Sequence, residues 1–251
     1  MLYQERSASD AHGNSMLFLD SFAISCQSRP MTLDIKICGL KTEAAMAAAL
    51  AGGASHVGFI FFPKSPRYVE PAEAGRLREA ARGKAKAVAV TVDADDAFLD
   101  EIVAKMLPDM LQLHGSETPA RVAEVKARYG LPVMKVFSVS EAADLERIKP
   151  FVGIADRLMF DAKPPKGSQL PGGNGVAFDW RLIAGIAPAR PWLLSGGLDP
   201  VNVAEAIAVT GARGVDVSSG VESAPGVKDP AKARAFIRAV RLTQGASLPV
   251  G

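Results

Sequence analysis

From residue 32 onward, the chain repeats one pattern of hydrophobic and polar positions. Each unit begins with a short apolar run rich in β-branched residues, followed by a turn and an Ala- and Leu-rich stretch with helical spacing. The apolar runs predict strands at residues 33–38, 56–61, 85–92, 110–113, 132–137, 157–161, 192–195 and 214–217. The stretches between them predict helices at residues 42–51, 71–81, 94–106, 118–129, 140–149, 200–209 and 230–242, with a weaker one near 179–186.

Eight βα units within about 220 residues predict an α/β protein with a closed (β/α)₈ TIM barrel. The alternative is an open doubly wound sheet, which usually has fewer strands and a Gly-rich fingerprint after the first one. Here the first strand runs instead into the segment 38–42, Cys-Gly-Leu-Lys-Thr. No linker rich in Pro, Gly or Ser divides the chain, so residues 31–251 are expected to form a single catalytic domain.

Residues 1–30 do not continue this pattern. Their apolar stretches are short and interrupted by Asp20, and no basic segment leads into a long apolar one, so a signal peptide fits poorly. Chain termini that nothing anchors are usually disordered. We therefore expect a poorly ordered N-terminal extension, or a non-native start with Met31 as the functional beginning.

Composition excludes several classes of function. The net charge of +2 is too balanced for nucleic-acid binding through a global positive field. No apolar run is long enough to cross a membrane. The two cysteines are Cys26 and Cys38, and the histidines lie far apart in the chain, so neither a disulfide framework nor a metal site is expected. This cysteine usage fits a reducing, cytoplasmic location.

In a barrel of this kind, chemistry takes place at the carboxyl ends of the strands. Lys36 and Cys38 end the first strand and, two positions apart, share one face. A nearby ammonium group favours the thiolate, which would make Cys38 a usable base. The competing interpretation is a buried, inert cysteine, since free cysteines are among the most buried residues.

Two further strands end in polar side chains. Asp161 ends the sixth strand, and Lys163 two positions on could pair with it, either as part of a site or as a structural ion pair. Gln112 and His114 share a face at the end of the fourth strand, where they could contact a substrate or be satisfied core groups.

The loops add candidate binding groups. Arg67 follows the second strand in a loop stiffened by two prolines, and its fork suits a planar carboxylate, although a solvated surface arginine is the commoner case. The loop 164–175 is rich in glycine and could be a mobile lid or a solvated connection.

The ends of the seventh and eighth strands carry small-residue turns, Ser-Gly-Gly-Leu at 195–198 and Asp-Val-Ser-Ser-Gly-Val-Glu at 216–222. Glycines allow backbone amides to approach a phosphate, and hydroxyls add donors. The loops after strands seven and eight are the usual phosphate site of such barrels. The two turns together therefore indicate a phosphorylated small-molecule ligand.

Six motifs resemble, in order and spacing, those of the phosphoribosylanthranilate isomerase family. They are DIKICGL, GFIFFPKSPRYV, LQLHG, MFDAK, LSGGL and VDVSSGVE, and the resemblance covers residues 33 to about 242. It implies an Amadori rearrangement of N-(5-phosphoribosyl)anthranilate to 1-(2-carboxyphenylamino)-1-deoxyribulose 5-phosphate in tryptophan biosynthesis. No metal or organic cofactor is implied, because the substrate's own nitrogen is the electron sink.

The resemblance also implies roles for individual residues. Asp161 matches the general acid that opens the furanose ring, Cys38 the general base at C2, and Arg67 the group that holds the anthranilate carboxylate. The expected phosphate-site residues are Gly196, Gly197, Ser219 and Gly220. The expected supporting polar contacts are His114, Asp216, Lys36 and Gln112.

Two other functions compete with this one. A dual-substrate phosphosugar isomerase, also acting in histidine biosynthesis, would be expected to have an aspartate where Cys38 ends the first strand. A non-catalytic phosphate-binding barrel would keep the glycine turns but would have no reason to retain both Cys38 and Asp161. The chain is expected to act as a monomer or homodimer.

Overall fold

A computed structural model describes residues 33–163, 167–168, 172–173, 175, 177–186, 188 and 190–245. The predicted N-terminal extension, residues 1–30, lies outside the described residues, as does much of the predicted lid at 164–175. No helix within the described part is long and apolar enough to span a membrane.

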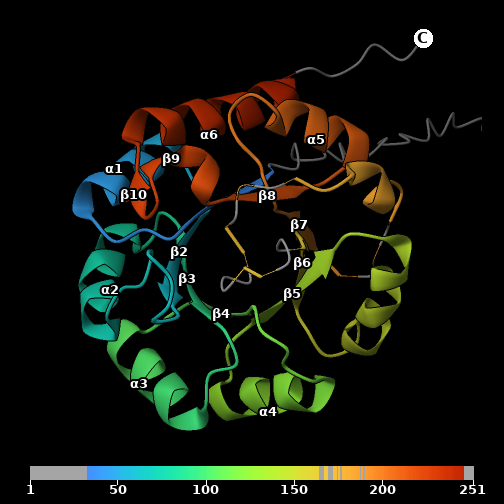
Figure 1. Ribbon diagram of the computed structural model, residues 1–251. Coiled ribbons are helices and arrows are strands. Elements are labelled where there is room, and N and C mark those ends of the chain that lie inside the picture. Colours follow the sequence, from blue (N-terminus) through green and yellow to red (C-terminus); the bar gives the residue numbers. More distant parts are fainter. Residues whose placement is uncertain are drawn as a thin grey trace, which may run out of the picture. The chain divides into compact units, whose positions relative to one another are not determined.

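Among the described residues, eight parallel strands close into a barrel in the order β1 to β8 (Figure 1). Their bounds are β1 Asp34–Cys38, β2 His56–Phe61, β3 Lys86–Thr91, β4 Met110–Leu113, β5 Val133–Val139, β6 Arg157–Ala162, β7 Trp192–Leu194 and β8 Gly214–Val217. Each lies within two residues of the predicted bounds. The sequence pattern therefore correctly separated the closed barrel from the open sheet.

The helices form a ring outside the strands (Figure 1). The α-helices are α1 Glu43–Gly52, α2 Pro71–Arg78, α3 Asp96–Met106, α4 Pro119–Tyr129, α5 Val203–Thr210 and α6 Pro230–Gly245. Threonine side chains cap two of them: the Thr42 hydroxyl accepts a hydrogen bond from the amide of Ala45, and that of Thr118 from the amide of Arg121.

Two predicted helices differ from expectation. Residues Ala142–Phe151 form a 3₁₀ helix, η2, which ends with Pro150 inside its last turn. The weaker prediction near 179–186 is the short 3₁₀ helix η3, Trp180–Ile183. Further 3₁₀ turns are η1, Glu79–Ala81, and η4, Ser219–Val221. A 3₁₀ helix has nearly the same side-chain spacing as an α-helix. The hydrophobic pattern alone therefore does not separate the two over a few turns.

A two-stranded hairpin, which the sequence pattern did not predict, follows the eighth barrel strand. It consists of β9, Glu222–Ala224, and β10, Val227–Lys228, and it turns at Pro225 and Gly226. Strands of two or three residues are too short to show alternation. The hairpin places Glu222 and Lys228 beside the turn after β8, where Lys228 donates to Glu222 and to the carbonyl of Ser218.

Strand register fixes the side chains beneath the site. Lys36 of β1 pairs in register with Asp216 of β8, so the two charged residues lie at the same level of the barrel wall. The buried side chains Val88, Met110, Met134, Met159 and Leu193 belong to a separate apolar cluster that also includes Cys38. This packing leaves the carboxyl ends of the strands as the open face of the barrel.

Candidate active site

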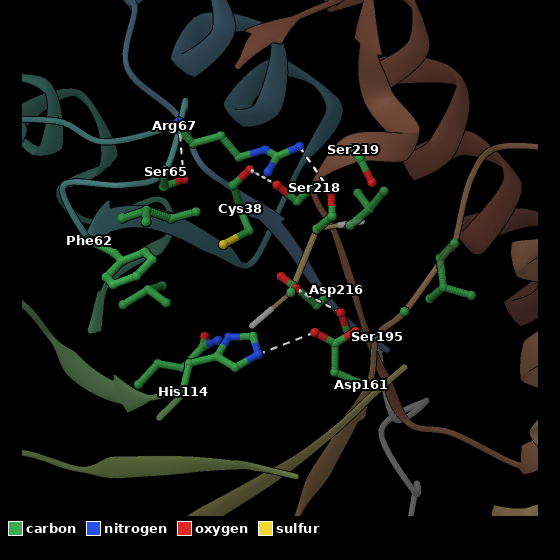
Figure 2. A pocket seen from close by; sticks show the side chains of 18 of the residues that line it. Cys38, Phe62, Ser65, Arg67, His114, Asp161, Ser195, Asp216, Ser218 and Ser219 are labelled. Atoms are coloured by element: carbon green, nitrogen blue, oxygen red, sulfur yellow. Dashed lines mark hydrogen bonds and ion pairs between the residues drawn. The ribbon is translucent and has the colours of Figure 1, made fainter. Parts of the chain in front are cut away.

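One pocket at the carboxyl ends of the strands collects most of the predicted site residues (Figure 2). Those that line it are Cys38, Arg67, Gln112, His114, Asp161, Gly196, Gly197, Asp216 and Ser219. Lys36 and Gly220 do not line it. Lys36 is completely buried behind Asp216, and Gly220 packs against the backbone of the neighbouring loop.

Lys36 forms a buried ion pair with Asp216. Its Nζ lies 2.8 Å from Asp216 Oδ1, and the other carboxylate oxygen accepts a hydrogen bond from Ser195 Oγ at 3.2 Å. Burial opposes the ammonium charge, but the attraction of Asp216 and of Cys38 raises the pKa of Lys36 above its ordinary value. Lys36 is therefore a fixed positive charge that acts on the pocket through its neighbours.

The thiol of Cys38 lies next to this ion pair and is itself buried. Burial raises the pKa of Cys38, Asp216 raises it further, and Lys36 and Lys228 offset only part of the rise. Lys36 therefore favours the thiolate, as the sequence predicts, but burial and Asp216 outweigh it, so the pKa of Cys38 is raised overall. The sequence shows a cation at position 36. It does not show how deeply the Cys38 thiol is buried, or that the Lys36 ammonium already pairs with the Asp216 carboxylate.

Asp161 faces His114 across the pocket (Figure 2). Asp161 Oδ2 lies 3.3 Å from His114 Nε2, an ion-pair distance without the alignment of a hydrogen bond, and Oδ1 accepts one from the amide of Ala162. Lys163, the partner expected from sequence, instead lies 3.8 Å from Asp144 and is half exposed. The pair of Asp161 and Lys163 that the sequence suggested is therefore not formed.

Arg67 is buried, and a carboxylate of the chain already holds part of its guanidinium. Nε and Nη2 donate to the two oxygens of Glu222, each at 2.8 Å, and Nη2 also donates to the carbonyl of Gly173 at 3.2 Å. The solvated surface arginine that competed with the binding role is therefore excluded.

The two small-residue turns lie side by side at the rim. Gly196 and Gly197 have φ values of 89° and 65°, which favour glycine. The carbonyl of Gly197 accepts a hydrogen bond from Asn202 Nδ2 at 2.9 Å, which anchors the first turn. A Cβ on Gly220 would lie 2.0 Å from the carbonyl oxygen of Leu198, so this glycine permits the close approach of the two loops.

Gln112 brings an unused acceptor into the pocket. Its side chain is almost completely buried, Nε2 contacts the sulfur of Met159 at 3.6 Å, and Oε1 has no hydrogen-bond partner among the described residues. A buried carbonyl without a partner is costly. Gln112 is therefore available to accept a hydrogen bond from a ligand.

Sequence reasoning missed four residues of this site: Ser195, Ser218, Glu222 and Lys228. Ser195, Ser218 and Glu222 lie inside the quoted motifs but carried no individual assignment, and Lys228 lies outside them. Within the described residues, no group of three or more His, Cys, Asp or Glu side chains is placed as a metal ion would require.

The fold and the site define a (β/α)₈-barrel protein whose rim presents a thiol, a carboxyl group and an arginine beside two glycine turns. Residues 35–239 match the family model described as N-(5'-phosphoribosyl)anthranilate (PRA) isomerase. The chain therefore belongs to the phosphoribosylanthranilate isomerase family, and it is an isomerase of this kind. The resemblance expected from the six motifs is confirmed.

Individual relatives agree with this membership. The N-(5'-phosphoribosyl)anthranilate isomerase of Mesorhizobium japonicum is 75% identical over 211 residues, which cover 84% of this chain and 96% of the relative. The solved phosphoribosyl anthranilate isomerase of Thermotoga maritima is 33% identical with a TM-score of 0.76, covering 84% of this chain and 99% of that one. Another solved isomerase, in complex with reduced 1-(o-carboxyphenylamino)-1-deoxyribulose 5-phosphate, is 31% identical with a TM-score of 0.72 and the same coverage.

Proposed function

We propose that this chain converts N-(5-phosphoribosyl)anthranilate to 1-(2-carboxyphenylamino)-1-deoxyribulose 5-phosphate, with Asp161 as the acid and Cys38 as the base. The observation that carries the assignment is that a thiol from β1 and a carboxyl group from β6 line the same pocket. The phosphate turns and Arg67 border that pocket, so a substrate held by its two anionic ends would lie between acid and base.

In the first step, Asp161 protonates the ring oxygen of the furanose. The bond between this oxygen and C1 breaks, the oxygen leaves as the C4 hydroxyl, and the anilino nitrogen donates its lone pair to form the C1=N Schiff base. Asp161 is left as a carboxylate, which His114 can stabilise when its imidazole is protonated, since Nε2 is 3.3 Å away.

In the second step, the Cys38 thiolate removes the proton from C2. The electron pair of the C–H bond forms the C1=C2 double bond, and the Schiff base becomes a neutral enolamine. Tautomerisation moves a proton to C1 and leaves the ketone at C2. Lys36 and Lys228 favour the thiolate needed at this step, although burial and Asp216 keep the resting group as the thiol.

Two anchors would hold the substrate during these steps. Arg67 would bind the anthranilate carboxylate, and the turns after β7 and β8 would bind the phosphate through backbone amides and Ser219. Binding of this kind places the reacting atoms without taking part in the proton transfers. Assembly as a monomer or homodimer and a cytoplasmic location remain predictions.

Assays of Cys38→Ala and Asp161→Asn test the two roles. We expect each change to reduce turnover by roughly 10²–10⁴, the usual worth of a general acid or base. Binding of the reduced product analogue should remain, because both anchors are intact. Near-full turnover of either variant would contradict that residue's role, and loss of binding together with turnover would mean that the two side chains shape the pocket only.

A further inference from the structure

Glu222 is a buried carboxylate that the proposed proton transfers do not use. It begins the hairpin β9–β10, directly after the turn that follows β8, and about nine-tenths of its surface is covered. Oε1 accepts from Arg67 Nε at 2.8 Å and from Lys228 Nζ at 2.7 Å. Oε2 accepts from Arg67 Nη2 at 2.8 Å and from the amide of Gly226 at 3.2 Å. One carboxylate thus fixes two buried cations.

Its second cation reaches the other anchor of the pocket. Lys228 Nζ donates to the carbonyl of Ser218 at 2.9 Å and to its hydroxyl at 3.2 Å, and that hydroxyl donates to the carbonyl of Cys38. Ser218 stands at the phosphate turn, and Cys38 is the proposed base. Glu222 is therefore the shared member of a hydrogen-bonded chain that runs from Arg67 to the phosphate turn and to the end of β1.

We propose that Glu222 is a positioning residue, which holds the Arg67 guanidinium in the one orientation that grips the substrate's carboxylate. The proposal rests on the role proposed for Arg67. Glu222 occupies the edge of the fork formed by Nε and Nη2. Among the described residues, the edge formed by Nη1 and Nη2 has one hydrogen-bond partner, the carbonyl of Gly173, which accepts from Nη2. This is the edge that would receive the ligand. A substrate carboxylate would take over that place.

Electrostatics alone predicts the opposite effect of Glu222. Its negative charge partly neutralises Arg67, so removing the charge should strengthen the attraction of any anion. The loss of orientation outweighs this gain in attraction, because a released Arg67 side chain has space into which it can turn. A second cavity of about 350 Å³ lies beside Arg67, lined by Pro66, Gly173, Glu222 and Pro225. A guanidinium released by Glu222 can turn toward it, and the bidentate grip would then be lost.

The experiment compares two inhibitors that differ only in the carboxylate. One is the reduced product analogue, and the other is its counterpart with an unsubstituted phenyl ring. We expect Glu222→Gln to weaken the carboxylated inhibitor by about tenfold, with little change for the carboxylate-free one, and to raise KM more than it lowers kcat. Equal or tighter binding of the carboxylated inhibitor, or equal losses for both, would overturn the proposal.

Arg67→Met separates this proposal from the proposed function. If Arg67→Met does not weaken the carboxylated inhibitor selectively, the proposed grip itself is wrong. If Arg67→Met weakens it and Glu222→Gln does not, only the positioning role is wrong. In the double variant the two effects should not add, because Glu222 acts through Arg67.

Fold and surface charge are controlled with two further variants. Glu222→Gln leaves two buried cations without their carboxylate, so Glu222→Gln/Lys228→Met, with one cation fewer, is the variant to use if the single one does not fold. It should show the same selective loss, and its absence would overturn the proposal. Glu73→Gln is the matched control, since the exposed Glu73 also pairs with an arginine, Arg76, and should change neither inhibitor.

Discussion

The pKa of Cys38 depends on its burial and on the charges of nearby side chains, chiefly Lys36 and Asp216. Lys36 favours the thiolate, whereas burial and the Asp216 carboxylate favour the thiol, and the second influence is larger. Because Lys36 donates a hydrogen bond to Asp216, the carboxylate offsets part of the effect of its charge on the thiol. Gly58 leaves the room this arrangement needs, since a Cβ there would lie 2.9 Å from the Cys38 sulfur and 3.0 Å from Lys36 Nζ.

The first residue-scale prediction follows from the signs of these influences. Because the pKa of Cys38 is raised, the thiol is the resting form at neutral pH, and kcat/KM should rise as pH increases toward that pKa. Asp216→Asn removes a charge that raises this pKa, so it should move the rise to lower pH. Lys36→Met removes a charge that lowers it and should move the rise to higher pH.

Thiolate absorbance in the ultraviolet measures the same pKa without turnover. The titration is best done with Cys26→Ser as the background, because the chain has two cysteines. Shifts of opposite sign in Asp216→Asn and Lys36→Met are expected. Shifts in the same direction would mean that the substitutions alter burial of the thiol more than its electrostatics.

At the scale of elements, the sequence predicted what periodicity and capping can encode. The eight strands were predicted because their residues are mostly apolar. Strands of a parallel barrel are buried on both faces, by the barrel interior on one side and the helices on the other. Cap residues in the sequence, Thr42 and Asp229, mark the starts of α1 and α6. The helix predicted at residues 200–209 begins later, since α5 starts at Val203: Asp199 caps a preceding turn by accepting from the amides of Val201 and Asn202.

The rest of the site could not be predicted because it depends on contacts between distant elements. Glu222 is 155 positions from Arg67 in the chain, and nothing local in the sequence around either residue indicates that they pair. Lys163 is near Asp161 in sequence, yet its carboxylate partner is Asp144. Sequence spacing gives the face of a strand from which a side chain projects, but it does not give the partner that reaches it from another loop.

The element-scale prediction concerns the phosphate turns. Gly220→Val is a poor probe, since its Cβ would collide with the Leu198 carbonyl and displace both loops. Ser219 lines the pocket and is partly exposed, so a substitution there is accommodated. Ser219→Asp should weaken the reduced product analogue by roughly tenfold or more, because a carboxylate would face the phosphate.

Ser219→Asn is the matched control for this change, since asparagine has nearly the same size without the charge. It should bind the analogue far better than Ser219→Asp does, and the difference should shrink as ionic strength rises. Equally weak binding by both variants would mean that size at position 219 decides, and equally strong binding would move the phosphate site away from this turn.

At the scale of the whole molecule, the two ends of the barrel have different tasks. The carboxyl ends of the strands carry the pocket, and the opposite end carries residues whose contacts only stabilise. There, Asp34 at the start of β1 pairs with Arg157 at the start of β6, and His56 at the start of β2 is 2% exposed. His56 Nδ1 lies 2.8 Å from the hydroxyl of Ser55.

His56 makes the stability of the barrel depend on pH. Burial lowers the pKa of His56 to about 4, and Arg157, Lys36 and Lys86 add to this against the opposing charge of Asp34. A folded-state pKa below the unfolded one means that the unfolded chain binds the extra proton first, so stability falls as pH drops from about 6.5 toward 4. Between pH 7 and 4.5 the loss from His56 alone should be about 2 kcal/mol.

Comparison with His56→Asn isolates this contribution from the carboxylates that titrate in the same range. Asparagine can keep a hydrogen bond to the Ser55 hydroxyl but cannot gain a proton. Urea denaturation of both proteins at several pH values should give free energies of unfolding that converge as pH falls, with the wild type losing about 2 kcal/mol more than the variant. Parallel curves would mean that the pKa of His56 is the same in the folded and the unfolded chain. Turnover at neutral pH should be the same in both, because this end of the barrel does not touch the pocket.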